Sequence, residues 1–189
     1  MGKWIFRTGA AIVCLVLIAL GAGYLWLQYA AKKGLPQFSG EVLVSGIKKE
    51  VEIIRDTYGI PHIYSQNEPD LYFALGFAMA QDRMWQMDFY RRLGQGRLSE
   101  ILGETFVETD RYFRLLSAAG INKEIPNELS FMLKSFSDGV NAYLIDHRDK
   151  LPLEFKILRY KPDPWHPEDY LASVRTGIQN SLILLINIA

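Results

Sequence analysis

The feature that most constrains this chain is an uncharged run close to its N-terminus. No Asp, Glu, Lys or Arg occurs in the 24 residues 8–31, between Arg7 and Lys32. As a helix this run is about 36 Å long, which exceeds the roughly 30 Å of a bilayer's hydrocarbon core. The run therefore predicts a transmembrane helix. Aromatic residues suited to the two membrane interfaces flank it at both ends: Trp4, Phe6, Tyr24, Trp26 and Tyr29.

A cleaved signal peptide is the alternative reading of this run, with Lys3 and Arg7 as its basic start. Its apolar part is normally shorter than the run, and no clear small-x-small cleavage site precedes Tyr24. We therefore predict an uncleaved signal-anchor over residues 1–33, with the N-terminus inside and the remainder on the extracellular face. Cleavage would instead give a secreted protein.

Composition excludes several classes of protein. Lys plus Arg and Asp plus Glu both number 21, so the chain lacks the basic surplus of a nucleic-acid binder. The apolar share of 49% excludes a disordered chain. A single cysteine, Cys14, excludes an intrachain disulfide and a multi-cysteine zinc site.

Residues 34–189 are predicted to form an α+β region that starts with short strands. Val42, Val44 and Ile47 favour one strand, residues 51–54 a second and residues 60–64 a third, with a turn at 56–59 between the last two. Pro61 places the third strand at an edge or makes it a strand start. Strands this few and this short are not stable alone, so we expect them to join a larger sheet.

Helical spacing replaces the strand pattern from Asn67 onward. Asn67 and Asp70 form a start similar to a capping box. The most regular amphipathic spacing predicts a helix over residues 129–144. Shorter helices are predicted around Leu71–Ala78, around Met84–Arg91, over residues 98–102 before Gly103, and from Pro167 onward, and prolines between 151 and 164 indicate an irregular connector.

No catalytic residue or metal ligand stands out in the sequence itself. The three histidines lack metal-ligand spacing, and neither a nucleophile elbow nor a phosphate-binding loop is present. His62 is interpreted as making a local hydrogen bond. The charged residues Asp82, Arg83, Arg91 and Arg92 are interpreted as solvated or as contacts to a partner chain, and Met84, Trp85, Met87 and Trp165 as core or anchoring residues.

Several motifs in a fixed order resemble the penicillin amidase (penicillin acylase) family. The first two are VEIIRDTYGIPHI at 51–63 and DLYFALGFAMAQDRMWQMD at 70–88. RRLGQGRLSEILG at 91–103 and DRYFR at 110–114 follow, and then FSDGVNA at 136–142 and PLEFKILRYKPDPW at 152–165. The resemblance covers roughly residues 40–177, and ordered motifs of this number are far more specific than one pattern.

The resemblance implies a fold and a chemistry. Members of this family are N-terminal-nucleophile hydrolases with an αββα fold, made as precursors that cleave themselves into a small α chain and a large β chain. The β chain begins with a serine whose own α-amino group acts as the base, and an amine with a pKa near neutrality suits that role. The expected reaction is hydrolysis of linear amides, including penicillins, cephalosporin side chains and acyl-homoserine lactones.

Carried onto this sequence, the resemblance assigns substrate-binding positions but no catalytic residue. The two acyl-pocket positions are Ile178 and Leu182, where the penicillin G enzymes have Met and Phe. The penicillin G enzymes have an arginine just before that Phe, and its position falls at Ser181. Their Glu that helps to bind calcium falls near Ile188, and an isoleucine side chain cannot bind a metal. We therefore expect no metal and no cofactor. Ser173 and Ser181 lie within the expected last helix and are not candidates for the processed serine.

Two functions remain open. In the first, residues 34–189 form an incomplete α-chain region that works only with a β chain of the same precursor, and the chain alone is inactive. Residues 180–189 are unlike the family, which suggests a truncated or frame-shifted gene. In the second, the protein is a non-catalytic membrane-anchored remnant or binding module.

Overall fold

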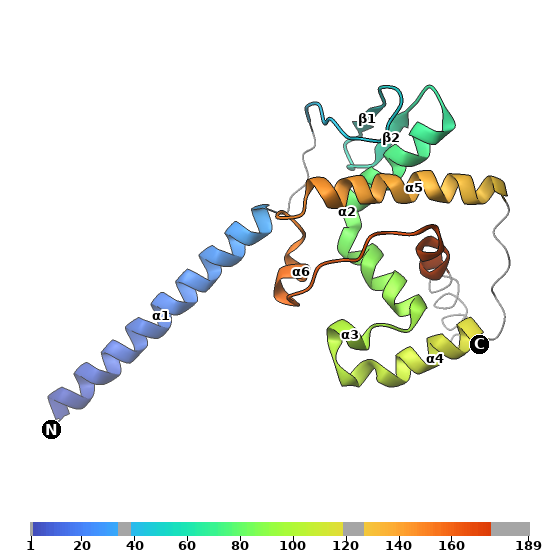
Figure 1. The fold of residues 1–189 in the computed structure, drawn as a ribbon. Helices are drawn as coiled ribbons and strands as arrows, with labels where there is room; N and C mark the ends of the chain where they lie inside the picture. Colours follow the sequence, from blue (N-terminus) through green and yellow to red (C-terminus); the bar gives the residue numbers. More distant parts are fainter. Residues whose placement is uncertain (1, 34–38, 119–126, 175–189) are drawn as a thin grey trace. The chain divides into compact units, whose positions relative to one another are not determined.

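The computed structural model describes residues 2–33, 39–118 and 127–174 (Figure 1). Its contacts divide the chain into two compact units, residues 1–35 and residues 36–189. Helices dominate both units. In chain order the elements are α1 (Gly2–Lys33), β1 (Glu52–Arg55), β2 (Pro61–Tyr64), α2 (Glu68–Gln95), α3 (Ser99–Leu102), a 3-10 turn (Glu104–Phe106), α4 (Val107–Ala118), α5 (Asn127–Asp146) and α6 (Leu153–Ile157).

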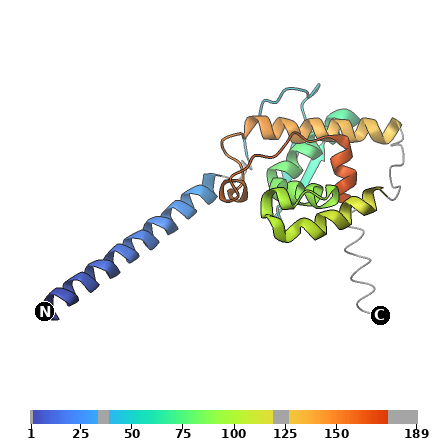
Figure 2. The same ribbon diagram turned by 60° about the horizontal axis from the view of Figure 1, so that its bottom comes forward.

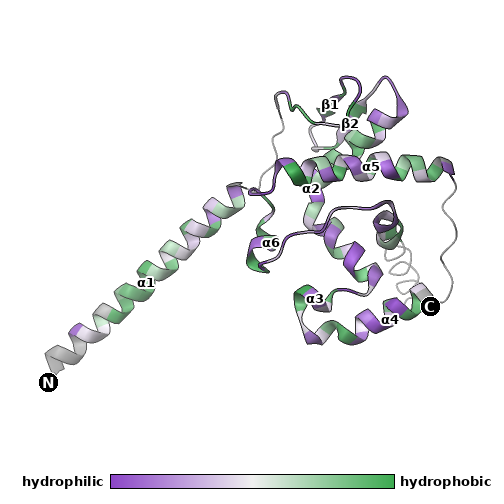
Figure 3. Ribbon diagram, in the orientation of Figure 1, coloured by the Kyte–Doolittle hydropathy of each residue, from purple (hydrophilic) through white to green (hydrophobic). Residues whose placement is uncertain are grey.

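The first unit is the single helix α1. A span of 26 residues within it, Arg7–Lys32, has a mean hydropathy of 2.4. Figure 3 shows how apolar residues dominate the middle of this helix. By length and composition α1 can cross a bilayer, and a signal sequence near an N-terminus has the same properties.

The second unit begins with a β-hairpin. β1 and β2 pair antiparallel, with Ile53 opposite Ile63 and Arg55 opposite Pro61. The Arg55 guanidinium donates to the Asp82 carboxylate at 2.8 Å and to the Gln81 side chain at 2.9 Å, so this face of the hairpin lies on α2. Ile54 and Tyr64, on the other face, are 48% and 58% exposed.

The helices α2 and α5 form the core of the second unit and lie across one another (Figure 1 and Figure 2). Two glycines allow their backbones to touch. A Cβ at Gly76 would collide with the Phe136 carbonyl, and one at Gly139 with the Phe73 carbonyl. The remaining core residues pack around this contact, among them Phe77, Met84, Met87, Val140, Tyr143, Phe155 and Trp165.

The start of α2 is fixed by a buried carboxylate. The Asn67 side chain caps the helix by accepting from the Asp70 N–H at 2.9 Å. The Asp70 carboxylate accepts from the Lys48 and Lys49 N–H groups, both at 2.9 Å, and from the Asn67 amide. Asp70 therefore ties the segment before the hairpin to the first turn of α2, where acidic side chains also favour the helix dipole.

Several sequence predictions are confirmed and others are wrong. The hairpin, the 56–59 turn, α3 with its Gly103 cap, α5 and the helix from Pro167 are present. The strand predicted around Val42, Val44 and Ile47 is absent from the described residues. This segment packs near Phe73 of α2, and the sheet of the described residues pairs only β1 with β2. The two helices predicted across 71–91 are one helix kinked at Arg83, and α4 and α6 were not predicted.

Candidate functional site

The second unit contains a buried cluster of charged side chains around Asp88. The Asp88 side chain is fully buried and accepts hydrogen bonds from Arg91 Nε at 2.8 Å and Arg92 Nε at 2.9 Å. The Tyr160 hydroxyl donates to the same carboxylate at 2.7 Å. Arg91 and Arg92 follow Asp88 by three and four residues, so both lie on the same side of α2 as the acid.

Arg91 connects α2 to the segment that follows α6. Its guanidinium, 3% exposed, donates to the Asp169 carboxylate at 3.1 Å and to the Pro164 and Asp163 carbonyls at 3.1 and 2.7 Å. It also lies 5.0 Å above the Trp165 ring. One arginine thus satisfies the carbonyl groups of an irregular segment that has no helix or sheet partner of its own.

The Asp88 carboxylate raises the pKa of two of its neighbours, Arg92 and Tyr160. Burial alone lowers the pKa of Arg92, but the neighbouring Asp88 carboxylate outweighs it and raises that pKa above its ordinary value. Burial and the hydrogen bond to Asp88 both raise the pKa of Tyr160. These groups therefore hold fixed protonation states near neutral pH, which suits a structural clamp rather than proton transfer.

The clamp positions the helical residues 167–174. Asp169 accepts from the Gln95 amide at 2.5 Å and from the His166 N–H at 2.8 Å, next to its bond to Arg91. Gly94 lets this helix approach, because a Cβ there would collide with the Ala172 carbonyl. The end of α2 and the start of the last helix are therefore in direct backbone contact.

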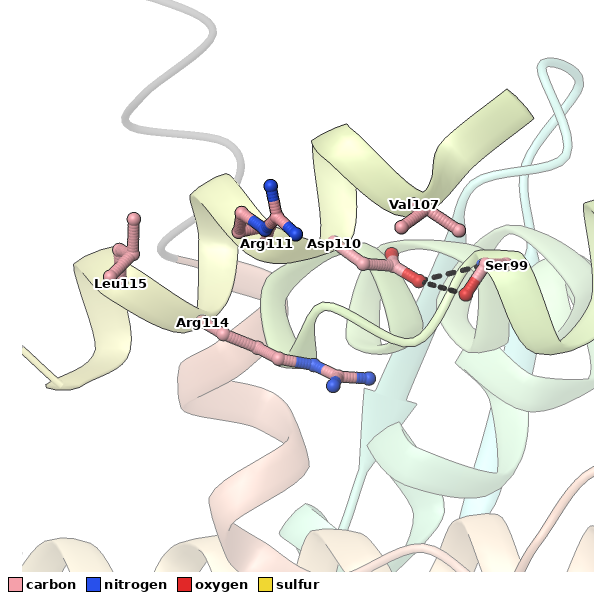
Figure 4. A pocket seen from close by; sticks show the side chains of 6 residues that line it. All are labelled: Ser99, Val107, Asp110, Arg111, Arg114 and Leu115. Atoms are coloured by element: carbon pink, nitrogen blue, oxygen red, sulfur yellow. Dashed lines mark hydrogen bonds between the residues drawn. The ribbon is translucent and has the colours of Figure 1, made fainter. Parts of the chain in front are cut away.

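A pocket of about 440 Å³ lies between α3 and α4. Figure 4 shows Asp110 hydrogen-bonded to Ser99 on one side of it, while Arg111 and Arg114 extend from α4 in different directions. Asp110 accepts from the Leu98 and Ser99 N–H groups, both at 2.8 Å, and from the Ser99 hydroxyl. Asp110 and Ser99 are therefore engaged at the start of α3. Arg114 donates to the Gly96 carbonyl at 2.8 Å and Arg111 to Glu108 at 3.2 Å, so each polar side chain of this pocket has a structural partner.

A larger groove, of about 1190 Å³, lies beside the hairpin. Residues 39–44 and 47–53 form much of its wall, and Phe73, Ala74 and Phe77 of α2 contribute apolar surface. Leu43 in this wall is 97% exposed and Val42 43%. The groove lies beside both strands of the hairpin, with Ile53 of β1 and Tyr64 of β2 in its lining.

The predicted substrate-binding residues lie outside the described part of the chain. Ile178 and Leu182 are in residues 175–189, as are Ser181 and Ile188. Ser173 is described, and its hydroxyl donates to the Asp169 carbonyl at 2.9 Å within its own helix. Over residues 2–33, 39–118 and 127–174, no group of three or more His, Cys, Asp and Glu side chains could hold a metal ion.

The interpretation of Arg91 and Arg92 as solvated or partner-chain contacts is wrong. Both are buried, at 3% and 4% exposure, and pair within this chain. The spacing from Asp88 was the signal that sequence reasoning missed, because an acid followed by bases at three and four residues pairs on one helix face. Asp82 also pairs within this chain, with Arg55.

Other interpretations of single residues are confirmed. The structure buries Met84, Met87 and Trp165 in the core. His62 makes the predicted local contact, to the Asp56 carboxylate at 3.5 Å.

Comparison with known proteins identifies the class to which this fold belongs. Residues 50–181 match the sequence model of the penicillin amidase family. The matched region holds the hairpin, the α2–α5 core and the Asp88 cluster. The chain belongs to the penicillin amidase family.

The relatives include acylases of two kinds. The chain is 37% identical over 171 residues to acyl-homoserine lactone acylase QuiP of Pseudomonas aeruginosa, an alignment that covers 88% of this chain and 20% of the relative. It is also 37% identical over 150 residues to penicillin acylase 2 proenzyme of Pseudomonas sp. strain SE83, where the alignment covers 77% of this chain and 19% of the relative. The chain thus spans about a fifth of the length of these curated relatives.

Among solved structures, the fold is similar to a thermostable penicillin G acylase from Alcaligenes faecalis. The TM-score is 0.61 at 29% sequence identity. The alignment covers 70% of this chain and 73% of the matched chain. The predicted family resemblance is therefore confirmed by sequence and by fold.

Proposed function

We propose that this protein supplies the α-chain region of a penicillin amidase-like acylase that hydrolyses linear amide bonds. The observation that carries the proposal is the match of residues 50–181 to the family together with a fold similar to a penicillin G acylase chain. The nucleophile is an N-terminal serine on a separate β chain. The relative named as a proenzyme supports a processed partner chain.

In this proposal the described residues have a structural task. The Asp88 cluster fixes the start of the last helix against α2. Ile178 and Leu182 follow that helix in the sequence, and we propose that they line the acyl pocket. Apolar residues at both positions favour an apolar acyl group, because a pocket of this kind discriminates by shape and buried area.

The test is reconstitution of an active pair. The full chain is co-expressed, in detergent extracts, with the remaining chain of the penicillin acylase 2 precursor from Pseudomonas sp. strain SE83. We expect hydrolysis of phenylacetyl or long-chain acyl anilides by the pair and none by either chain alone. Activity of this chain alone would contradict a nucleophile on another chain, and an inactive, unassociated pair would favour a non-catalytic binding module.

The pocket assignment has its own test in the same pair. Leu182→Phe should change the ratio of kcat/KM between phenylacetyl and long-chain substrates by about tenfold or more, because it adds bulk to an apolar pocket. Ile145→Phe is the matched control, at a 66% exposed position of α5. Equal, small effects of the two substitutions would remove Leu182 from the pocket.

We also propose that α1 anchors the chain in a membrane with the second unit on the extracellular face. The support is the length and apolarity of the span Arg7–Lys32. After expression, the chain should resist alkaline carbonate extraction, whereas a variant lacking residues 1–31 should not. Recovery of soluble protein with a mature N-terminus near Tyr24 would indicate a cleaved signal instead.

A further inference from the structure

The last turn of α2 contacts the helical residues 167–174 in two different ways. Gly94, which is buried, gives a backbone contact, because a Cβ there would collide with the carbonyl of Ala172. Gln95, the next residue, gives a polar contact, and its amide donates to the Asp169 carboxylate at 2.5 Å. Asp169 and Ala172 are almost one helical turn apart, so the two contacts define the direction of this helix as well as its place.

The contact at Gly94 leaves no room for a local adjustment. The atom that a Cβ would meet belongs to the backbone of residue 172, so it cannot rotate aside as the end of a side chain could. Because a carbon–oxygen contact needs about 3.3 Å, that carbonyl would have to move by on the order of 1 Å. Tyr170 of the same helix packs on Phe136 of α5, with ring centroids 5.6 Å apart, so its other contacts would be displaced as well.

These contacts come shortly before the proposed acyl pocket in the sequence. Ile178 and Leu182 follow Ala172 by six and ten residues. A displacement at residue 172 therefore changes the point from which the chain leads to both pocket residues. A misplacement of about 1 Å can change a rate by about 100-fold, and one methylene group in an apolar pocket is discriminated by about tenfold or more.

We infer that Gly94 and Gln95 are positioning residues for the acyl pocket, and that they set its preference among acyl groups without touching the substrate. The inference rests on the proposed function, which places Ile178 and Leu182 in that pocket. Glycine at position 94 allows the close approach of the last helix to α2, and the Gln95 amide holds the helix at that place.

The test uses full-length variants, each co-expressed with the remaining chain of the SE83 precursor. Gly94→Ala adds a methyl group at the contact with the last helix, and its control Gly139→Ala adds the same group at the contact between α5 and the first half of α2. Gln95→Leu removes the hydrogen bond to the last helix. Its control Gln81→Leu is the same change at another half-buried position of α2, where the side chain is bonded to the hairpin.

The readout is the ratio of kcat/KM between phenylacetyl and long-chain acyl anilides. A loss of folded or paired protein lowers both values equally and cancels in this ratio, whereas a displaced pocket does not. We expect Gly94→Ala to change the ratio by about tenfold or more and Gln95→Leu by about threefold or more. Gly139→Ala and Gln81→Leu should leave the ratio within about twofold, although Gly139→Ala lowers stability.

A ratio that stays within about twofold in Gln95→Leu, or that changes equally in a variant and its control, would overturn the inference. If Gly94→Ala gives no active pair, the comparison of Gln95→Leu with Gln81→Leu decides the question. Both results leave the proposed function intact, since the unsubstituted pair is active. An inactive unsubstituted pair would remove the proposed function and this inference with it.

Discussion

Removing the charge of Asp88 should destabilise the second unit far more than removing the charge of an exposed carboxylate. Asp88→Asn keeps the size of the side chain but leaves Arg91 and Arg92 without their shared counter-ion. Both guanidiniums are nearly inaccessible to water, at 3% and 4% exposure. Breaking a buried ion pair from one side costs about 3–5 kcal/mol, because the remaining charge stays buried.

The remaining partners place the effect at the lower end of that range. Arg91 keeps Asp169 at 3.1 Å, and Arg92 keeps Glu100 at 2.8 Å. The asparagine oxygen also remains as an acceptor. We therefore expect a loss of about 3 kcal/mol in the free energy of unfolding. With a urea dependence of about 2 kcal/mol per molar, the unfolding midpoint should fall by about 1.5 M.

The assay is pulse proteolysis of the full chain in mild detergent across a urea series. Asp138→Asn is the matched control, because the same chemical change removes the exposed ion pair with Lys134. An exposed pair contributes about 0–1 kcal/mol, so the midpoint of this control should scarcely change. If Asp88→Asn moved the midpoint no further than Asp138→Asn, the argument from burial would be refuted.

Three further substitutions test other contacts in the same assay. Burial raises the pKa of Asp70, but its hydrogen bonds from Lys48, Asn67 and Lys49 outweigh this and hold the pKa below the ordinary 3.8. The Asp70 carboxylate therefore contributes its full stabilisation above pH 3.8, and this contribution is lost as the pH falls through the lower pKa of the folded state. The unfolding midpoints of Asp70→Asn and of the unsubstituted chain should differ at neutral pH and converge in strong acid. Gly139→Ala should cost about 1–3 kcal/mol or more, since its Cβ meets the Phe73 carbonyl, and an unchanged midpoint would contradict the close helix contact. Tyr160→Phe should cost about 1 kcal/mol through loss of its bond to Asp88, and a gain in stability would show that this bond is not formed.

The sequence predicted correctly those helices and caps that depend only on residues close together in the chain. The spacing of apolar residues predicted α5, and a proline followed by two acids predicted the helix that begins at residue 167. The Asn67 cap was visible for the same reason. The bond partners of Asp70 were not, because the Lys48 and Lys49 N–H groups come from a segment about twenty residues away.

The wrong predictions concern residues whose structure depends on contacts with distant parts of the chain. Val42, Val44 and Ile47 have β propensity, but Val44 packs on the helical core and no strand pairs with this segment in the described residues. The buried state of Arg91 depends on Asp169, 78 residues later, and on two carbonyl groups of the connector. No window of sequence contains both partners, so charge alone suggested an exposed position.

The long helix α2 links the hairpin to the connector and the last helix. Before its kink at Arg83, Asp82 is bonded to Arg55 of the hairpin. After the kink, Asp88 and Arg91 hold the connector and the last helix.

The helix α5 contacts both the first half of α2 and the connector. Gly139 touches the first half at Phe73, and the side chain of Asn141 exchanges two hydrogen bonds with the Trp165 backbone, at 2.8 and 2.7 Å. The hairpin and the helix that begins at Pro167 are therefore fastened to one packed frame. The proposed acyl-pocket residues come directly after that helix in the sequence, so the frame fixes the point from which the chain leads to them, as accurate placement of an acyl group requires.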